Sequence, residues 1–175
     1  MKFSAKFTLI VLSLLASSVY AERSPDYKET LDAVRKDGSE PEQVKAIRAE
    51  YQAAVKLSSE QKENRIYRQE KISENGTSII LNISYVGSEQ GNIASTFYIT
   101  ANPKGVKGWS SEYLFDKNSG ELIFAYDRDA SSKKKLELRC YWQNGELIHS
   151  KINGSLHDDC ATLKLRAEEL KAMAK

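Results

Sequence analysis

The chain contains few cysteines and histidines, two residue types from which many active sites and metal sites are built. Among its 175 residues are two cysteines and two histidines, His149 and His157. The histidines lack the close spacing of zinc ligands on a helix, and the cysteines do not form a Cys-x-x-Cys motif. The sequence also has no Gly-x-Ser-x-Gly nucleophile elbow, no glycine-rich phosphate loop and no dinucleotide fingerprint. We therefore predict no catalytic residue, no metal site and no cofactor.

Two alternatives would nevertheless use the histidines. A metal site would take His149, His157 and a carboxylate of Asp158 or Asp159 as nitrogen and oxygen ligands. A hydrolase would use one of the two histidines in acid–base chemistry. Asp158 or Asp159 is also a plausible N-cap for a helix that follows, which explains these carboxylates without a ligand.

The N-terminal residues have the pattern of a secretory signal peptide. Lys2 and Lys6 precede an almost unbroken apolar run from Phe7 to Leu15. Small residues, the last of them Ala21, follow this run as they do before a cleavage site. The run is too short to span a membrane core of about 30 Å. We expect cleavage after Ala21 and a periplasmic or secreted protein without a membrane span. The predicted organisation is a signal peptide at 1–21, a helical segment at 22–64 and a sheet with a C-terminal helix at 65–175, with 22–175 as one domain.

The chain has no surplus of charge once residues 1–21 are removed. That segment contains two of the 26 basic residues and none of the 24 acidic ones, so the remaining 154 residues carry 24 of each sign. A neutral protein has no long-range attraction for a phosphate backbone, so we do not expect nucleic acid as a partner. The oligomeric state does not follow from the composition.

Cys140 and Cys160 both lie in the exported part of the chain. Two cysteines in an oxidising compartment usually form a disulfide. We predict this bond, which would connect a strand to the first turn of the last helix. The alternative is a thiol pair that binds metal or performs redox chemistry.

Apolar periodicity changes along the chain and predicts an α+β fold. Two amphipathic helices come first, with apolar stripes at Tyr27, Leu31 and Val34 and at Val44, Ile47, Tyr51 and Val55. From about residue 65 the period becomes two and the gaps are short, which predicts an antiparallel meander of six or seven strands. Asn144-Gly145 is typical of a type I′ hairpin turn. A helix with a stripe at Leu163, Ala167 and Leu170 ends the chain. We expect the three helices to cover one face of the sheet, which could be strongly curved.

Tyrosines on the predicted strands suggest a binding surface. Tyr98 lies between Phe97 and Ile99, and Tyr141 lies between Cys140 and Trp142, so both would point away from the apolar face. Rigid aromatic side chains on an open sheet suit contact with a protein partner. The leading hypothesis is an exported, non-enzymatic binding protein that contacts a protein of the cell envelope. Its candidate binding residues are Tyr98, Glu112, Tyr113 and Tyr141.

A second hypothesis is a carrier that holds a small apolar molecule between the curved sheet and the helices. This function requires an apolar cavity, whereas the first requires a filled core, and a structure without an apolar cavity larger than roughly a few hundred Å³ would rule it out on size grounds.

Overall fold

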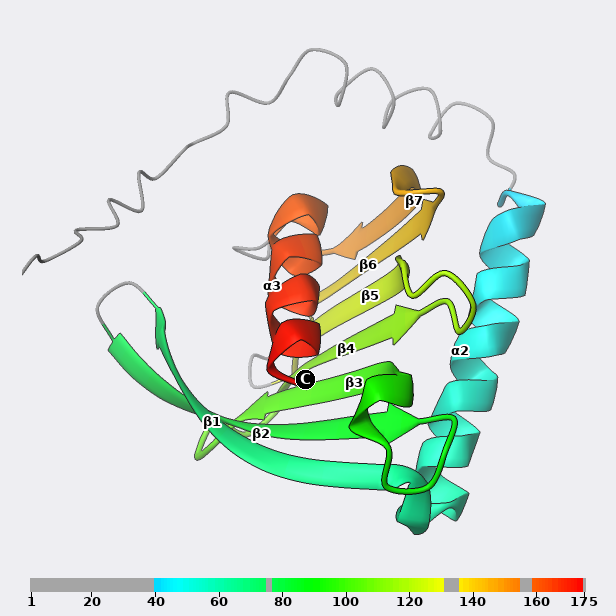
Figure 1. The fold of residues 1–175 in the computed structure, drawn as a ribbon. Helices are drawn as coiled ribbons and strands as arrows, with labels where there is room; N and C mark the ends of the chain where they lie inside the picture. Colours follow the sequence, from blue (N-terminus) through cyan, green and yellow to red (C-terminus); the bar gives the residue numbers. More distant parts are fainter. Residues whose placement is uncertain (1–39, 75–76, 131–135, 155–158, 175) are drawn as a thin grey trace, which may run out of the picture.

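A computed structural model describes residues 40–74, 77–130, 136–154 and 159–174. The described part contains two α-helices and one seven-stranded sheet (Figure 1). The helices are α2 (Glu42–Glu60) and α3 (Cys160–Met173), and two short 3₁₀ turns are η1 (Lys62–Asn64) and η2 (Ile93–Ser95). The strands are β1 (Arg65–Glu74), β2 (Thr77–Gly87), β3 (Thr96–Pro103), β4 (Trp109–Phe115), β5 (Leu122–Asp129), β6 (Leu136–Gln143) and β7 (Glu146–Asn153).

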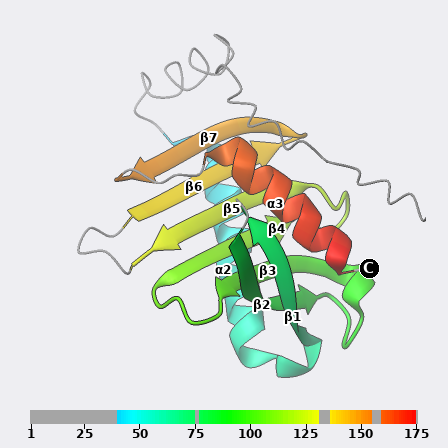
Figure 2. The ribbon, with the colours of Figure 1, turned by 90° about the vertical axis from the view of Figure 1, so that its left-hand side faces the viewer.

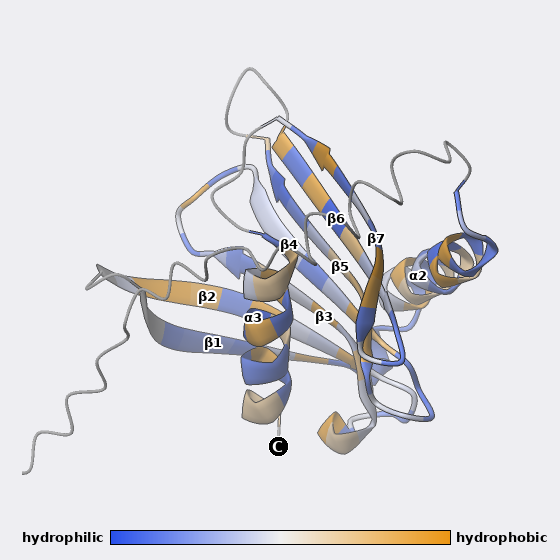
Figure 3. Ribbon diagram, turned by 90° about the horizontal axis from the view of Figure 1, so that it is seen from above, coloured by the Kyte–Doolittle hydropathy of each residue, from blue (hydrophilic) through white to orange (hydrophobic). Residues whose placement is uncertain are grey.

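The strands form the antiparallel meander that the period of two predicts. Their order in the sheet is their order in the chain, and every neighbouring pair is antiparallel. Asn144 and Gly145 both have positive φ, 52° and 78°, as a type I′ turn requires between β6 and β7. The long β1–β2 hairpin curves towards α3 (Figures 1 and 3). The sheet is therefore concave on the α3 side.

The two described helices lie on opposite faces of the sheet, with α3 on the concave face and α2 on the other (Figures 2 and 3). The expectation that the helices share one face is wrong. The physical reason is that the central strands are apolar on both faces: Ile99, Tyr113 and Cys140 belong to the core beneath α3, and Tyr98 and Phe124 to the core beneath α2. Each face has to be removed from water.

A disulfide between Cys140 and Cys160 joins β6 to the first turn of α3 and confirms the predicted bond. The Asp159 side chain accepts a hydrogen bond from the Thr162 N–H at 2.8 Å, which confirms the predicted N-cap. The Cys140–Cys160 disulfide is consistent with an oxidising compartment outside the cytosol.

The expected pair of N-terminal helices is only partly described. α2 occupies the segment for which the sequence predicts the second helix. The predicted first helix at Tyr27, Leu31 and Val34 and the predicted signal peptide at 1–21 lie outside the described residues. Among the helices that the structure describes, none is long and apolar enough to cross a membrane.

Candidate functional site: an apolar pocket between the sheet and α3

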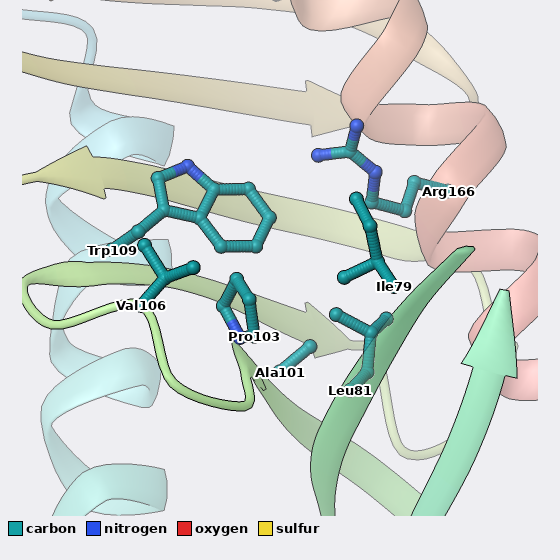
Figure 4. A pocket seen from close by; sticks show the side chains of 7 residues that line it. All are labelled: Ile79, Leu81, Ala101, Pro103, Val106, Trp109 and Arg166. Atoms are coloured by element: carbon teal, nitrogen blue, oxygen red, sulfur yellow. The ribbon is translucent and has the colours of Figure 1, made fainter. Parts of the chain in front are cut away.

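A pocket of about 260 Å³ opens on the concave side of the sheet, between one end of β2–β4 and the middle of α3 (Figure 4). Ala101 forms its base and Leu81 lines one wall, and both are almost fully buried, with 1% and 2% of their surface exposed. Val106 is 53% exposed, so this side of the pocket faces solvent. The lining side chains are Ile79, Leu81, Ala101, Pro103, Val106, Trp109 and Arg166.

Local sequence explains why the core is incomplete here. Ala101 is a small residue at a position of β3 that lines the pocket, so its methyl group leaves space that a larger side chain would fill. The chain then turns sharply between β3 and β4 through Gly105 and Gly108, whose φ values are 83° and 88°. Val106 lies in this turn and forms one side of the pocket (Figure 4).

Trp109 and Arg166 line the pocket where it approaches α3. The Arg166 guanidinium lies over the Trp109 ring, with 5.6 Å between its central carbon and the ring centroid. α3 is held in place independently of this contact. Its N-terminus is fixed by the disulfide, and Lys164 and Lys171 donate to the carbonyl oxygens of Gly145 and Gly120. Arg166 is the only charged residue among the described side chains that line the pocket.

A buried polar cluster lies next to the pocket, on the same face of β4 and β5. Ser111 and Asp127 are opposite each other in the sheet, and the Ser111 hydroxyl donates to Asp127 Oδ1 at 2.5 Å. Tyr113 is fully buried beside them, and its hydroxyl has no hydrogen-bond partner among the described residues. Burial raises the pKa of Tyr113 to about 12, and the nearby Arg166 cation opposes that rise. These groups give the sheet a polar patch beside an otherwise apolar pocket.

The four predicted binding residues do not form one open surface. Tyr98 and Tyr141, each 2% exposed, are covered by α2, whereas Tyr113 is buried on the opposite face beneath α3. The expectation that these tyrosines point into solvent is therefore wrong. Their rings fill cores on both faces, because an aromatic ring contributes a large apolar area when it is buried. Tyr98 and Tyr141 are thus about as deeply buried as their chain neighbours Phe97, Ile99, Cys140 and Trp142.

Glu112 is half-buried beneath α2 and connects this helix to the sheet. Its Oε2 atom accepts hydrogen bonds from the hydroxyls of Tyr51 on α2, at 2.8 Å, and Tyr98 on β3. Burial, and then the Glu112 charge, raises the pKa of both phenols. Both tyrosines therefore stay neutral hydrogen-bond donors over the physiological range. In the structure Glu112 holds α2 to the sheet.

One of the two candidate histidines lies within the described residues and the other lies outside them. His149 lies on β7, where its ring packs 5.7 Å from that of Tyr141, and burial lowers its pKa. His157, the other proposed ligand, lies outside the described residues. Within the described ranges no three histidine, cysteine or carboxylate residues are grouped as a metal site would require. His149 therefore acts here as a packing residue of the α2 face.

The sequence does not single out the pocket residues. Ile79 and Trp109 are recognisable as strand residues, and Arg166 as a polar position of the last helix, but nothing indicates that they meet. Arg166 is far from the other lining residues in sequence, and only the placement of α3 brings it to them. Comparison with protein-family models, curated proteins and solved structures finds no match to this chain.

Proposed function

We propose that the protein is an exported, non-enzymatic carrier that binds a small apolar molecule in the pocket between the sheet and α3. The observation that carries this proposal is a preformed cavity of about 260 Å³ that is lined by six apolar residues and one arginine. Burial of ligand surface against such a lining supplies the affinity. Pockets for drug-sized ligands occupy roughly 300–1,000 Å³, so the ligand is smaller than that class.

Binding of benzyl alcohol to the purified, disulfide-intact protein tests this proposal. We expect its addition to shift the NMR resonance of the Trp109 indole N–H. Ala101→Leu should abolish the shift, because the larger side chain fills the base of the pocket. Ala53→Leu, the same substitution at an exposed position of α2, is the matched control and should leave binding unchanged. A shift that survives in Ala101→Leu, or no shift in the parent protein, would contradict the proposal.

The proposed location is the periplasm or the exterior of the cell, after removal of residues 1–21. The disulfide supports it, because such bonds persist in oxidising compartments. Mass spectrometry of the native protein should find a chain that begins at Glu22 and is two hydrogens lighter than its reduced form. Native protein that begins at Met1 with two free thiols would contradict this location.

A second candidate is binding of an envelope protein to the aromatic face that carries Tyr98, Glu112 and Tyr141. This function requires α2 to leave the sheet. The observation that favours it is that three apolar residues of this long helix are buried, Val44, Ile47 and Ala54, whereas Tyr51 and Leu57 are only partly buried against the sheet. Hydrogen exchange distinguishes a helix α2 that detaches from the sheet from one that stays packed on it. If α2 detaches, its amides exchange at a much lower free energy than those of β4 and β5, whereas equal values would exclude an accessible aromatic face.

A further inference from the structure

The size of the pocket limits its ligand to a compact molecule. An engineered apolar cavity of about 150 Å³ holds a benzene molecule. The present pocket, at about 260 Å³, is less than twice that size. A single substituted ring fits this volume, whereas a long acyl chain would extend beyond the lining residues.

The shape and chemistry of the walls favour a ring over an open chain. The Trp109 indole forms one wall, and Ile79 and Leu81 on β2 form the opposite one (Figure 4). A flat ring can pack against the indole in the offset or edge-to-face arrangements that aromatic pairs prefer. A ring also has fewer rotatable bonds to immobilise than a chain with the same number of carbons, so it loses less entropy on binding.

The charges around the pocket favour an uncharged ligand. Asp127 is only 1% exposed, and a buried carboxylate is stable only where cations or hydrogen-bond donors compensate it. Ser111 supplies one donor, and Arg166 is the cation that α3 brings to this side of the sheet. Trp109, over which Arg166 lies, is two positions from Ser111 on the same face of β4, and Ser111 pairs with Asp127, so the cation and the carboxylate flank the same end of the pocket.

Either sign of ligand charge therefore meets a repulsive group. An anionic ligand placed beside Arg166 would also lie near the buried Asp127 carboxylate, which would repel it. A cationic ligand would approach the Arg166 guanidinium, which already lies over the Trp109 ring. A neutral ligand leaves the arrangement of Ser111, Asp127 and Arg166 unchanged.

We propose that this pocket selects compact, uncharged ring compounds over charged rings and over open chains with the same number of carbons. This inference rests on the proposed carrier function and adds the chemical class of the ligand. No covalent step is involved. Recognition depends on the apolar walls for affinity and on the buried carboxylate and the guanidinium for rejection of ions.

Four probes with seven carbons each test the inference on the disulfide-intact protein. Benzyl alcohol is a neutral ring, benzoate an anionic ring, benzylammonium a cationic ring and 1-heptanol a neutral chain. Their dissociation constants are measured at neutral pH from the Trp109 indole resonance, and the buried Trp142 serves as an internal control. We expect benzyl alcohol to bind at least about tenfold more tightly than each of the other three.

The outcomes separate this inference from the function on which it rests. If benzoate or benzylammonium binds as tightly as benzyl alcohol, selection against charge is overturned. If 1-heptanol does so, selection for a ring is overturned, while the carrier function stands in both cases. If no probe binds in an Ala101-dependent way, the carrier function and the inference both fail.

Discussion

Ser111 and Asp127 face each other across β4 and β5, both almost completely buried, with the serine hydroxyl donating to the aspartate at 2.5 Å. A charged group inside a sheet would destabilise the fold if its hydrogen bonds were missing. The Ser111 hydroxyl stabilises the Asp127 carboxylate, and the pair lies beside the pocket. A substitution in either residue should therefore affect stability.

Removal of the Ser111 hydroxyl should destabilise the protein. Ser111→Ala takes a donor from a buried carboxylate, which costs about 2 kcal/mol of unfolding free energy. Urea denaturation measures this change. Ser88→Ala removes a hydroxyl from an exposed position and should change stability by less than about 0.5 kcal/mol. An equally small effect at Ser111 would show that its hydrogen bond does not stabilise the fold.

Glu112 and Tyr98 should be energetically coupled. Glu112→Ala leaves the buried Tyr98 hydroxyl without its acceptor, at a cost of about 1–3 kcal/mol. In a Tyr98→Phe background that hydroxyl is absent, so the same substitution should cost less. A double-mutant cycle followed by urea denaturation gives the coupling energy. Strictly additive effects of the two substitutions would contradict the contact.

Alkaline pH should unfold the protein through its buried tyrosines. The pKa of Tyr113 is about 12 in the folded state against 10.0 for a free tyrosine, and the pKa values of Tyr51 and Tyr98 are also raised. The unfolded chain therefore releases these protons at lower pH than the folded protein. The stabilisation is complete below about pH 10 and is lost as the pH rises towards about 12.

Phenolate absorbance and circular dichroism, recorded during one alkaline titration, check this prediction. The ionisation of the buried tyrosines should coincide with the loss of the dichroism of the sheet. Complete ionisation of all tyrosines while the dichroism is unchanged would show that these phenols are accessible in the folded protein.

Loss of the disulfide should weaken the attachment of α3. The bond joins residues separated by 20 positions, and a loop of this size corresponds to about 3 kcal/mol of stabilisation. The double substitution Cys140→Ala with Cys160→Ala should lower the free energy of unfolding by about that amount in guanidinium chloride. Because Arg166 reaches the pocket from α3, the variant should also bind benzyl alcohol more weakly. Unchanged stability would contradict the role assigned to this bond.

The sequence was sufficient to predict the sheet because strand periodicity and turn residues are local signals. The alternation of apolar and polar residues from β2 to β6 and the Asn144-Gly145 turn indicate an antiparallel meander. The predicted export to an oxidising compartment indicates the Cys140–Cys160 disulfide. The placement of the helices was not predictable in the same way. Tyr98 and Ile99 are adjacent on β3 and point to opposite faces, so both faces of the sheet are apolar here. Periodicity cannot decide which helix covers which of two apolar faces.

The pocket could not be predicted for a related reason. It is a gap between tertiary elements, and it exists because Ala101 is small and because α3 brings Arg166 opposite Trp109. No single segment carries a signal for that arrangement. Tyrosines are amphipathic, so their alternation with apolar residues suggested an exposed face where the structure has a second core.

The most direct test of the carrier function is a crystal structure of the disulfide-intact protein exposed to iodobenzene, a neutral ring that carries an anomalous scatterer. We expect one dominant iodine peak inside the pocket, between Trp109 and Leu81, and its loss in Ala101→Leu. Iodine peaks confined to other sites, with the pocket empty at saturating iodobenzene, would contradict it.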